Sequence, residues 1–265
     1  MNVWPLQGRA APLQRATDTA ADLAARPGSP ITAAPPVQAG EVVVVVLVDF
    51  APQALWWGWS RLVLQRWPLR RVPGLRFAKV LGSGHDGGFG LRPSRTRQGL
   101  FLAFDGEVLA RDFIAQSPVM AGYRAHAREL CVALLQACSS KGSWSGTRLN
   151  VSAEAPTEGP IAALTRASIR PSRARRFWRI QPGTERALAQ SSGCLLAVGL
   201  GEAPVLRQAT FSLWENAAAM DAYARSGAHG DAIRAAYSGG FFSETMFVRF
   251  RPLSLQGSWQ GVRHG

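Results

Sequence analysis

An internal repeat restricts the fold of this chain more than any other feature of its sequence. A shift of 119 residues places Phe50–Pro52 on Ile169–Pro171, and the same shift places Trp59 on Trp178. Tryptophan is a rare residue, so the alignment of two tryptophans at the same shift supports a true repeat. A chain of 265 residues that repeats at this distance is expected to fold as two similar halves.

The repeat continues through the middle of each half, but its shift changes. The stretch GLRFAKVLG (74–82) aligns without a gap on GCLLAVGLG (193–201) at the shift of 119. Farther along, residues 99–118 align on residues 209–228 at a shift of 110. Nine residues are therefore inserted between these two stretches in the first half.

Three segments follow from the repeat. Residues 1–40 are rich in Ala, Pro, Thr and Gln without a sustained period, which is typical of a disordered leader. Residues 41–150 form the first repeat and residues 151–265 the second. Both repeats end in similar tetrapeptides, KGSW (141–144) and QGSW (256–259).

Each half has the pattern strand, helix, strand, strand, helix, strand. In the second half, the alternating stretch IAALTRASI (161–169) predicts the first strand, and Asn216 is the expected N-cap of the second helix. This order is that of a ferredoxin-like unit. We therefore expect the α+β class, with two tandem ferredoxin-like (βαββαβ) repeats packed as one α+β barrel of the dimeric type.

A glycine-rich stretch, VLGSGHDGGFG (80–90), has the G-x-G-x-x-G spacing of dinucleotide-binding sites. Such a site needs a helix directly after the glycines. Here a proline and another predicted strand follow, and the stretch coincides with the nine inserted residues. We therefore interpret it as a loop between strands. Arg92, Arg95 and Arg97 would make this loop an anion-contacting lid, and the alternative is an ordinary flexible hairpin loop.

Composition restricts the partners and the compartment. The formal net charge is +13, and lysine occurs only at Lys79 and Lys141. An arginine excess suits nucleic acid, a membrane surface or an acidic ligand, although it also suits a merely solvated basic surface. The three cysteines lack C-x-x-C spacing, which favours a reducing compartment.

No membrane span or signal peptide is apparent. The longest apolar run, residues 42–48, is far shorter than the roughly 20 residues that a spanning helix needs. The N-terminus lacks the continuous apolar core of a signal peptide. The sequence predicts a cytoplasmic protein, with a peripheral position on the inner face of the membrane as an extension of that prediction.

The motifs of several enzyme classes are missing, and the catalytic residues remain unassigned. The chain has no G-x-S-x-G, H-E-x-x-H or Cys/His cluster, which disfavours hydrolases and zinc enzymes. Among the histidines, His126 is expected on the polar side of an amphipathic helix. His229 stands where the first half has the apolar Val119, so it is the candidate to point inward. A neutral imidazole in an apolar pocket suits haem iron, although a structural histidine is the alternative.

A tryptophan- and arginine-rich stretch, LWWGWSRLVLQRWPLRR, follows the first strand. Trp56, Trp59 and Val63 share a helical face, which predicts core packing. Trp57 and Arg61 lie elsewhere on the helix, where they suit the interface of an anionic membrane. Nucleic acid is the competing partner, but no HTH, RRM or KH signature accompanies the stretch.

Four long runs resemble one known family: GLRFAKVLGSGHDGGFGLRP, GPIAALTRASIRPSRARRFWR, VLRQATFSLWENAAAMDAYAR and HGDAIRAAYSGGFFSETMFVRF. They look like the spheroidene monooxygenases, a family of bacterial carotenoid ketolases, from about residue 42 to residue 260. The resemblance implies a haem-dependent monooxygenase. Such an enzyme uses O₂ and an electron donor such as ferredoxin to place a keto oxygen on an acyclic carotenoid. The resemblance also fits the dimeric α+β-barrel superfamily, which includes haem enzymes and cofactor-free antibiotic-biosynthesis monooxygenases.

The resemblance also implies a site. His229 would hold the haem iron, and Arg166, Arg234 and Arg92 are the candidates to pair with the haem propionates. A carotenoid lives in the bilayer, so the tryptophan- and arginine-rich surface would meet the membrane there. The alternatives are a cofactor-free monooxygenase of the same fold and a non-catalytic basic module that binds lipid or nucleic acid.

Overall fold

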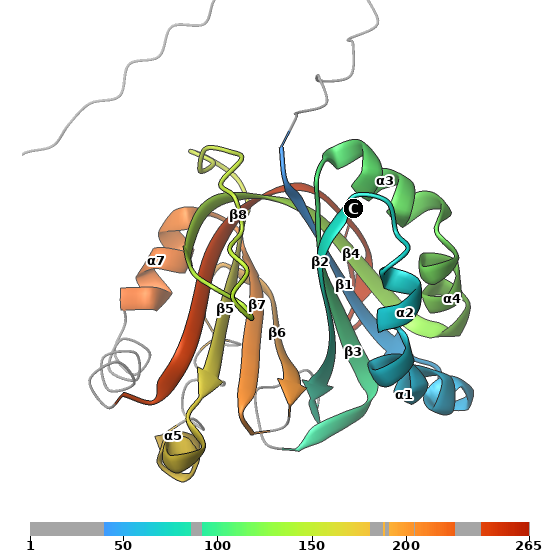
Figure 1. Ribbon diagram of the computed structural model, residues 1–265. Helices are drawn as coiled ribbons and strands as arrows, with labels where there is room; N and C mark the ends of the chain where they lie inside the picture. Colours follow the sequence, from blue (N-terminus) through green and yellow to red (C-terminus); the bar gives the residue numbers. More distant parts are fainter. Residues whose placement is uncertain are drawn as a thin grey trace, which may run out of the picture. The chain divides into compact units, whose positions relative to one another are not determined.

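The computed structural model describes residues 40–85, 92–180, 188, 191–203, 205–225 and 240–264 (Figure 1). The predicted leader, apart from Gly40, lies outside these residues. The first half comprises β1 (Val42–Phe50), α1 (Leu55–Leu64), α2 (Arg66–Leu69), β2 (Leu75–Gly84), β3 (Pro93–Phe104), α3 (Glu107–Gln116), α4 (Pro118–His126) and β4 (Ala127–Gly142). The second half comprises β5 (Ile161–Ile169), α5 (Ala174–Ile180), β6 (Cys194–Ala203), β7 (Arg207–Trp214), α7 (Ala217–Arg225), β8 (Phe242–Trp259) and β9 (Val262–His264). Short 3₁₀ turns, Pro52–Ala54 and Pro171–Arg173, precede α1 and α5.

The strands close into a barrel that contains both halves. Their order is β4-β1-β3-β2-β6-β7-β5-β8-β9, and β4 also pairs with β8. The β4–β8 seam is long and antiparallel, running from Cys131 opposite Gly257 to Gly142 opposite Met246. The β2–β6 seam has only two residue pairs, one of them Gly82 with Gly201. Two ferredoxin-like units thus share one barrel, which confirms the expected fold class.

The strand registers reproduce the sequence repeat. In the first half Gly82 of β2 pairs with Gln98 of β3, and in the second half Gly201 of β6 pairs with Gln208 of β7. The β2 and β6 positions differ by 119, whereas the β3 and β7 positions differ by 110. The insertion therefore lies in the β2–β3 hairpin, as predicted, although residues 86–91 are outside the described residues.

The apolar run of β1 is explained by burial on both faces of the sheet. Every residue of β1 is buried. Val43, Val45 and Leu47 face the barrel interior, where they join core residues of both halves. Val44 and Val46 belong to a second core, and α1 to α4 cover this outer face (Figure 1). A strand covered on both faces reads as a continuous apolar run rather than an alternating one.

The predicted core face of α1 is wrong. Trp56 is 88% exposed and Val63 is 62% exposed, whereas Trp57 packs inward with its ring centroid 5.8 Å from that of Phe50. Gly58 decides this orientation, because a Cβ at this position would lie 2.5 Å from the Phe50 ring. The face with the glycine approaches the sheet closely, and Trp56 and Val63 on the other face are left exposed.

His126 also differs from its predicted environment. It is the last residue of α4, and β4 begins at the next residue, so no amphipathic helix continues through this segment. The His126 ring stacks on Trp57 with the centroids 4.1 Å apart. Its Nδ1 atom lies 2.8 Å from the carbonyl oxygen of Gly122. The half-buried ring is therefore part of the packing between α1 and α4.

The two Gly–Ser–Trp motifs occupy equivalent places along the β4–β8 seam. Gly142 has φ +84° and Gly257 has φ +103°. A Cβ on Gly142 would lie 2.0 Å from the carbonyl oxygen of Thr245, and one on Gly257 would meet the carbonyl oxygen of Leu130 at 1.9 Å. Glycine is thus required at both positions for conformation and for space.

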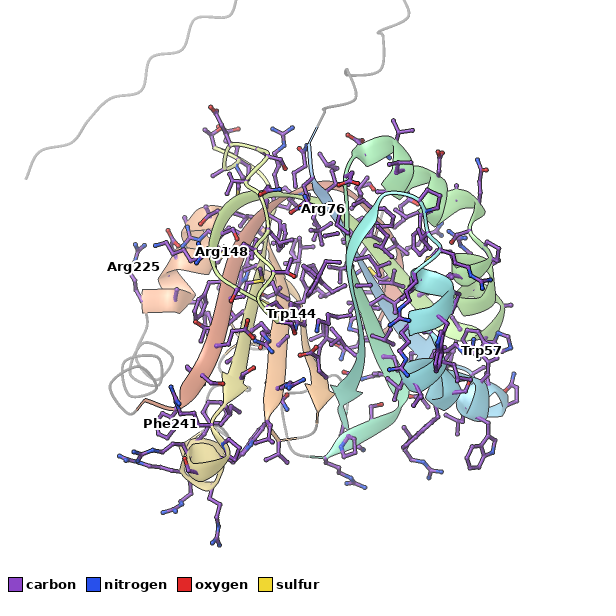
Figure 2. All side chains as sticks on the ribbon, viewed as in Figure 1. Trp57, Arg76, Trp144, Arg148, Arg225 and Phe241 are labelled. Atoms are coloured by element: carbon purple, nitrogen blue, oxygen red, sulfur yellow. The ribbon has the colours of Figure 1, made fainter. Side chains whose placement is uncertain are left out.

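The turn after each motif is held by a glutamate of the other half. Glu244 of β8 accepts a hydrogen bond from the backbone N–H of Gly146 at 2.9 Å. Glu129 of β4 likewise accepts one from the backbone N–H of Gly261 at 2.7 Å. The turns carry Trp144 and Trp259, both fully buried in the shared core, and Figure 2 shows Trp144 between the two halves.

Substitution of Gly142 tests this seam. Gly146 also has a positive φ, +76°, but a Cβ there meets no atom within 4 Å. Gly146→Ala is therefore the matched control, and we expect it to lower the free energy of unfolding by about 1–2 kcal/mol through backbone strain alone. Gly142→Ala adds the clash with Thr245 and should lower it by about 3 kcal/mol or more. Urea denaturation measures both, and equal losses would contradict the close approach at Gly142.

Candidate functional site

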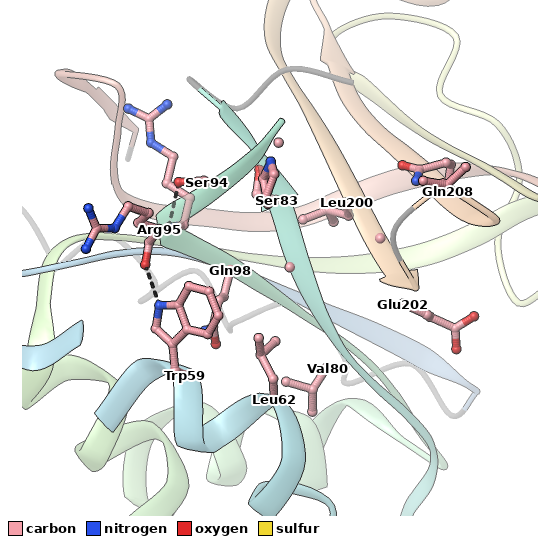
Figure 3. Close-up of a pocket in the computed structure, with 16 residues that line it drawn as sticks. Trp59, Leu62, Val80, Ser83, Ser94, Arg95, Gln98, Leu200, Glu202 and Gln208 are labelled. Atoms are coloured by element: carbon pink, nitrogen blue, oxygen red, sulfur yellow. Dashed lines mark hydrogen bonds between the residues drawn. The ribbon is translucent and has the colours of Figure 1, made fainter. Parts of the chain in front are cut away.

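A cavity of about 280 Å³ lies beside the short β2–β6 seam, between the two halves (Figure 3). This volume is just below the usual range of about 300–1,000 Å³ for ligand pockets. Both halves contribute to its walls. Its apolar lining comes from Trp59 and Leu62 of α1, Val80 of β2, Leu200 of β6 and Val205 between β6 and β7.

Polar groups also line this cavity, and two of them have unused hydrogen-bonding capacity. Arg97 binds Asp49 through Nε at 3.1 Å, while its buried Nη1 has no hydrogen-bond partner among the described residues. Gln98 donates from Nε2 to the carbonyl oxygen of Gly58 at 2.8 Å, while its buried Oε1 likewise has no partner among them. Both atoms are buried away from any accessible surface, so neither faces the open cavity, whose walls are largely apolar. Such a lining suits an apolar molecule.

Two equivalent hydrogen bonds connect helices to hairpins at this end of the barrel. The indole N–H of Trp59 donates to the carbonyl oxygen of Arg95 at 3.0 Å (Figure 3). The indole N–H of Trp178, its repeat counterpart, donates to the carbonyl oxygen of Val205 at 2.8 Å. The first bond fixes the indole of Trp59 as a wall of the cavity. The coincidence of the two tryptophans in the sequence repeat therefore has a structural cause.

Arg166 lies in a buried charged network rather than beside an open pocket. Its guanidinium binds Glu244 through Nη1 and Glu202 through Nη2, the latter at 3.2 Å. Lys79 binds the other oxygen of Glu202 at 2.6 Å. The Arg166 side chain is 2% exposed, and both of its terminal nitrogens are thus engaged by carboxylates of this chain.

The network holds its carboxyl groups in the charged form. Burial raises the pKa of Glu244, but hydrogen bonds from the Gly146 backbone, the Ser143 hydroxyl and Arg166 outweigh it and lower the pKa to about 2. For Glu202, burial also raises the pKa, and a hydrogen bond and positive charge from Lys79 lower it more. Both glutamates are therefore ionised at neutral pH and balance the buried arginine.

The structure describes only some of the other predicted site residues. Arg92 is exposed and does not line the cavity, whereas Arg95 and Arg97 of the same predicted lid do. His229 and Arg234 lie outside the described residues, so their roles stay predictions. Val119, the counterpart of His229, packs half-buried against the core beneath α1 to α4.

The cavity walls do not fit haem. No histidine, cysteine, methionine or tyrosine is among the residues that line the cavity, so these walls offer haem iron no axial ligand. The described histidines are used elsewhere: His85 is exposed at the end of β2, His126 stacks on Trp57, and His264 lies in β9. Within the described residues, no group of three or more His, Cys, Asp or Glu side chains could hold a metal ion.

Comparison with known proteins identifies the family. A curated spheroidene monooxygenase from Rubrivivax gelatinosus is 56% identical over 226 residues, which cover 85% of this chain and 88% of that protein. The chain belongs to the spheroidene monooxygenase family. A second member, from Rhodobacter capsulatus, is 40% identical over 77% of this chain and 87% of its own length. Family membership confirms the resemblance in the sequence, makes the chain an oxygenase, and disfavours a non-catalytic module.

The fold is also found in solved structures of low sequence similarity. An aldoxime dehydratase in complex with butyraldoxime superposes with a TM-score of 0.54 at 10% identity, covering 81% of this chain and 80% of that one. At this identity the likeness concerns the fold alone. No protein-family model matches the chain. In the described part of the chain, no helix has the length and apolar character needed to cross a bilayer.

Sequence reasoning missed several residues of the cavity. Gln98 and Glu202 are polar residues in strands, and no motif distinguishes them. The signals that were available are indirect: the insertion marks the β2–β3 hairpin, and the pairing of Trp59 with Trp178 marks the contact between helix and hairpin. Neither signal indicates that the two halves meet beside this hairpin.

The network predicts a pH dependence of stability. The pKa of Glu244 is lower in the folded chain, about 2, than in the unfolded chain, about 4.3. The carboxylate therefore stabilises the fold fully above the unfolded value, and this contribution is lost as the pH falls toward about 2. We expect Glu244→Gln to be less stable at neutral pH and to lose stability less steeply across that window.

Chemical denaturation at a series of pH values measures this effect. Glu158→Gln is the matched control, because Glu158 is an exposed residue between β4 and β5. Its curve should run parallel to that of the unchanged protein. A parallel curve for Glu244→Gln as well would show that this carboxylate is not held by the network.

Proposed function

We propose that this protein is a monooxygenase that places a keto oxygen on an acyclic carotenoid of the spheroidene type. The observation that carries the proposal is the 56% identity, over 85% of the chain, to a protein named spheroidene monooxygenase. The cavity between the halves supports it, because apolar walls suit a polyene. A carotenoid is much longer than a cavity of about 280 Å³ can enclose, so only the end of the chain would enter.

The reaction requires an electron donor. One hydroxylation consumes O₂, two electrons and two protons, places one oxygen atom in a C–H bond and releases the other as water. A second hydroxylation of the same carbon gives a geminal diol, which loses water to form the ketone. We propose that a ferredoxin, the kind of electron donor that the family resemblance implies, supplies the electrons.

Residues of the cavity would orient the substrate. The amide groups of Gln208, which is half-buried in the cavity lining, can donate to an oxygen substituent near the end of the carotenoid or accept from a hydroxyl group that forms there. Trp59 and Leu62 would hold the polyene next to these groups. This arrangement would position the end of the chain.

Filling the cavity tests its role. Gln208 lines it from β7, so we expect Gln208→Trp to lower carotenoid turnover by about tenfold or more, because the bulky ring displaces the substrate end. Gln116→Trp is the matched control, at an exposed position at the end of α3. Turnover of spheroidene, followed by chromatography, measures both. If both variants turn over spheroidene as fast as the unchanged protein and have the same melting temperature, the substrate binds elsewhere.

We further propose that the oxygen chemistry uses haem held by His229, with Arg234 as the first candidate for a propionate. Haem would supply the activation of O₂. The proposal is supported by the sequence repeat, in which His229 stands where the first half has the apolar Val119. Arg92 is exposed and remains available for such a role, whereas Arg166 would first have to release a carboxylate.

Titration with haemin tests this part of the proposal. We expect a saturable Soret band near one haem per chain in the unchanged protein and in His264→Ala, and its loss in His229→Ala. A band that survives in His229→Ala would contradict the assignment of the ligand. The absence of a specific band in every protein, with turnover retained, would favour a cofactor-free monooxygenase.

A further inference from the structure

The outer face of α1 and α2 exposes large apolar side chains. Trp56, Leu62, Val63, Leu64 and Trp67 are all exposed, beginning with Trp56 at 88%. Singly exposed apolar residues are common, but a contiguous group on one short segment marks an interaction surface. Because the inward orientation of Trp57 and Gly58 fixes these helices on the sheet, the apolar side chains cannot turn into the core.

The same surface is strongly basic. Residues 51–72 contain four arginines and no carboxylate, and residues 170–180, around α5, contain five arginines and no carboxylate. None of the ion pairs between described residues involves Arg173, Arg175 or Arg179. Their charges are therefore not neutralised by those residues, and they complement an anionic partner.

The helices α1 and α5 of these two basic segments lie at the same end of the barrel. Trp59 ties α1 to the β2–β3 hairpin, and Trp178 ties α5 to the β6–β7 connection. Figure 1 shows α1 and α5 beside the ends of these hairpins. The cavity opens at this end too, since Trp59 and Leu62 of α1 are among its walls. We call the exposed residues of α1 and α5 the hairpin-end face.

We propose that the hairpin-end face docks on an anionic lipid bilayer. Tryptophans and aliphatic side chains would enter the interface between headgroups and acyl chains, and the arginines would pair with lipid phosphates. Lipid fits better than nucleic acid, because Leu62, Val63 and Leu64 are aliphatic and cannot stack on bases. The docking is inferred only from the charge and the exposed apolar side chains of this face. Its consequence, that the cavity receives a carotenoid directly from the bilayer, rests on the proposed function.

Vesicle flotation with the full chain, without carotenoid, tests the docking. We expect the protein to float with vesicles of phosphatidylcholine and phosphatidylglycerol at low salt and to remain unbound with phosphatidylcholine alone. Replacing both Arg175 and Arg179, exposed residues of α5, by glutamine should lower the partition coefficient about thirtyfold, since each arginine near the surface contributes about 1 kcal/mol. Raising the salt concentration should have a similar effect.

Substitutions of exposed apolar side chains complete the test. Trp56→Ser should lower binding about tenfold or more, because the indole is the most exposed large side chain of the face. Val108→Ser and Val262→Ser are controls, since both valines are exposed outside the face, and they should bind as the unchanged protein does. Circular dichroism confirms that each variant is folded.

Three results would overturn the docking: equal binding to neutral vesicles, unchanged binding after the arginine or Trp56 substitutions, or binding of single-stranded oligonucleotides without any binding of vesicles. Turnover is measured separately, with spheroidene in detergent. A protein that binds vesicles but does not oxidise spheroidene would refute the proposed function and leave the docking. A protein that oxidises spheroidene but binds no vesicles would refute the docking and leave the proposed function.

Discussion

The long β4–β8 seam, with a Gly–Ser–Trp turn at each end, is the contact on which the rest of the structure depends. Gly142 and Gly257 allow the strands to approach a facing carbonyl oxygen that no side chain could tolerate. The turns that follow place Trp144 and Trp259 in the core shared by both halves. Each turn is held by a glutamate from the opposite half. The two halves thus interlock along one side of the barrel.

The other side of the barrel is joined much less tightly, and this difference creates the candidate site. Only two residue pairs connect β2 to β6, and the cavity lies beside them. The two halves also differ in the type of residue that occupies an equivalent position near this seam. Under the repeat, Arg166 corresponds to Leu47, a fully buried core residue of the first half. The arginine has therefore replaced an apolar residue close to the cavity, since its partner Glu202 also lines the cavity.

The fold was largely predictable from the sequence, because the repeat fixes the order of elements and the length of β1 and β5. The bounds of β5 agree with the predicted stretch, and Asn216 accepts the N-cap hydrogen bond from Ala219 at 2.9 Å. The face of α1 was not predictable from its periodicity, because the apolar residues surround the helix and Gly58 decides the contact. The cavity depends on how two halves meet across a short seam. Such a contact leaves no local pattern in either half.

The most direct test of this account is the origin of the oxygen in the product. Purified protein would be incubated with spheroidene, ferredoxin and a reductase under ¹⁸O₂, and the carotenoid analysed by mass spectrometry. The account predicts a ketone that carries ¹⁸O, and no label when ¹⁸O is supplied only as water. A product labelled from water, or no oxidised product under any condition that keeps the protein folded, would contradict the assignment as a carotenoid monooxygenase.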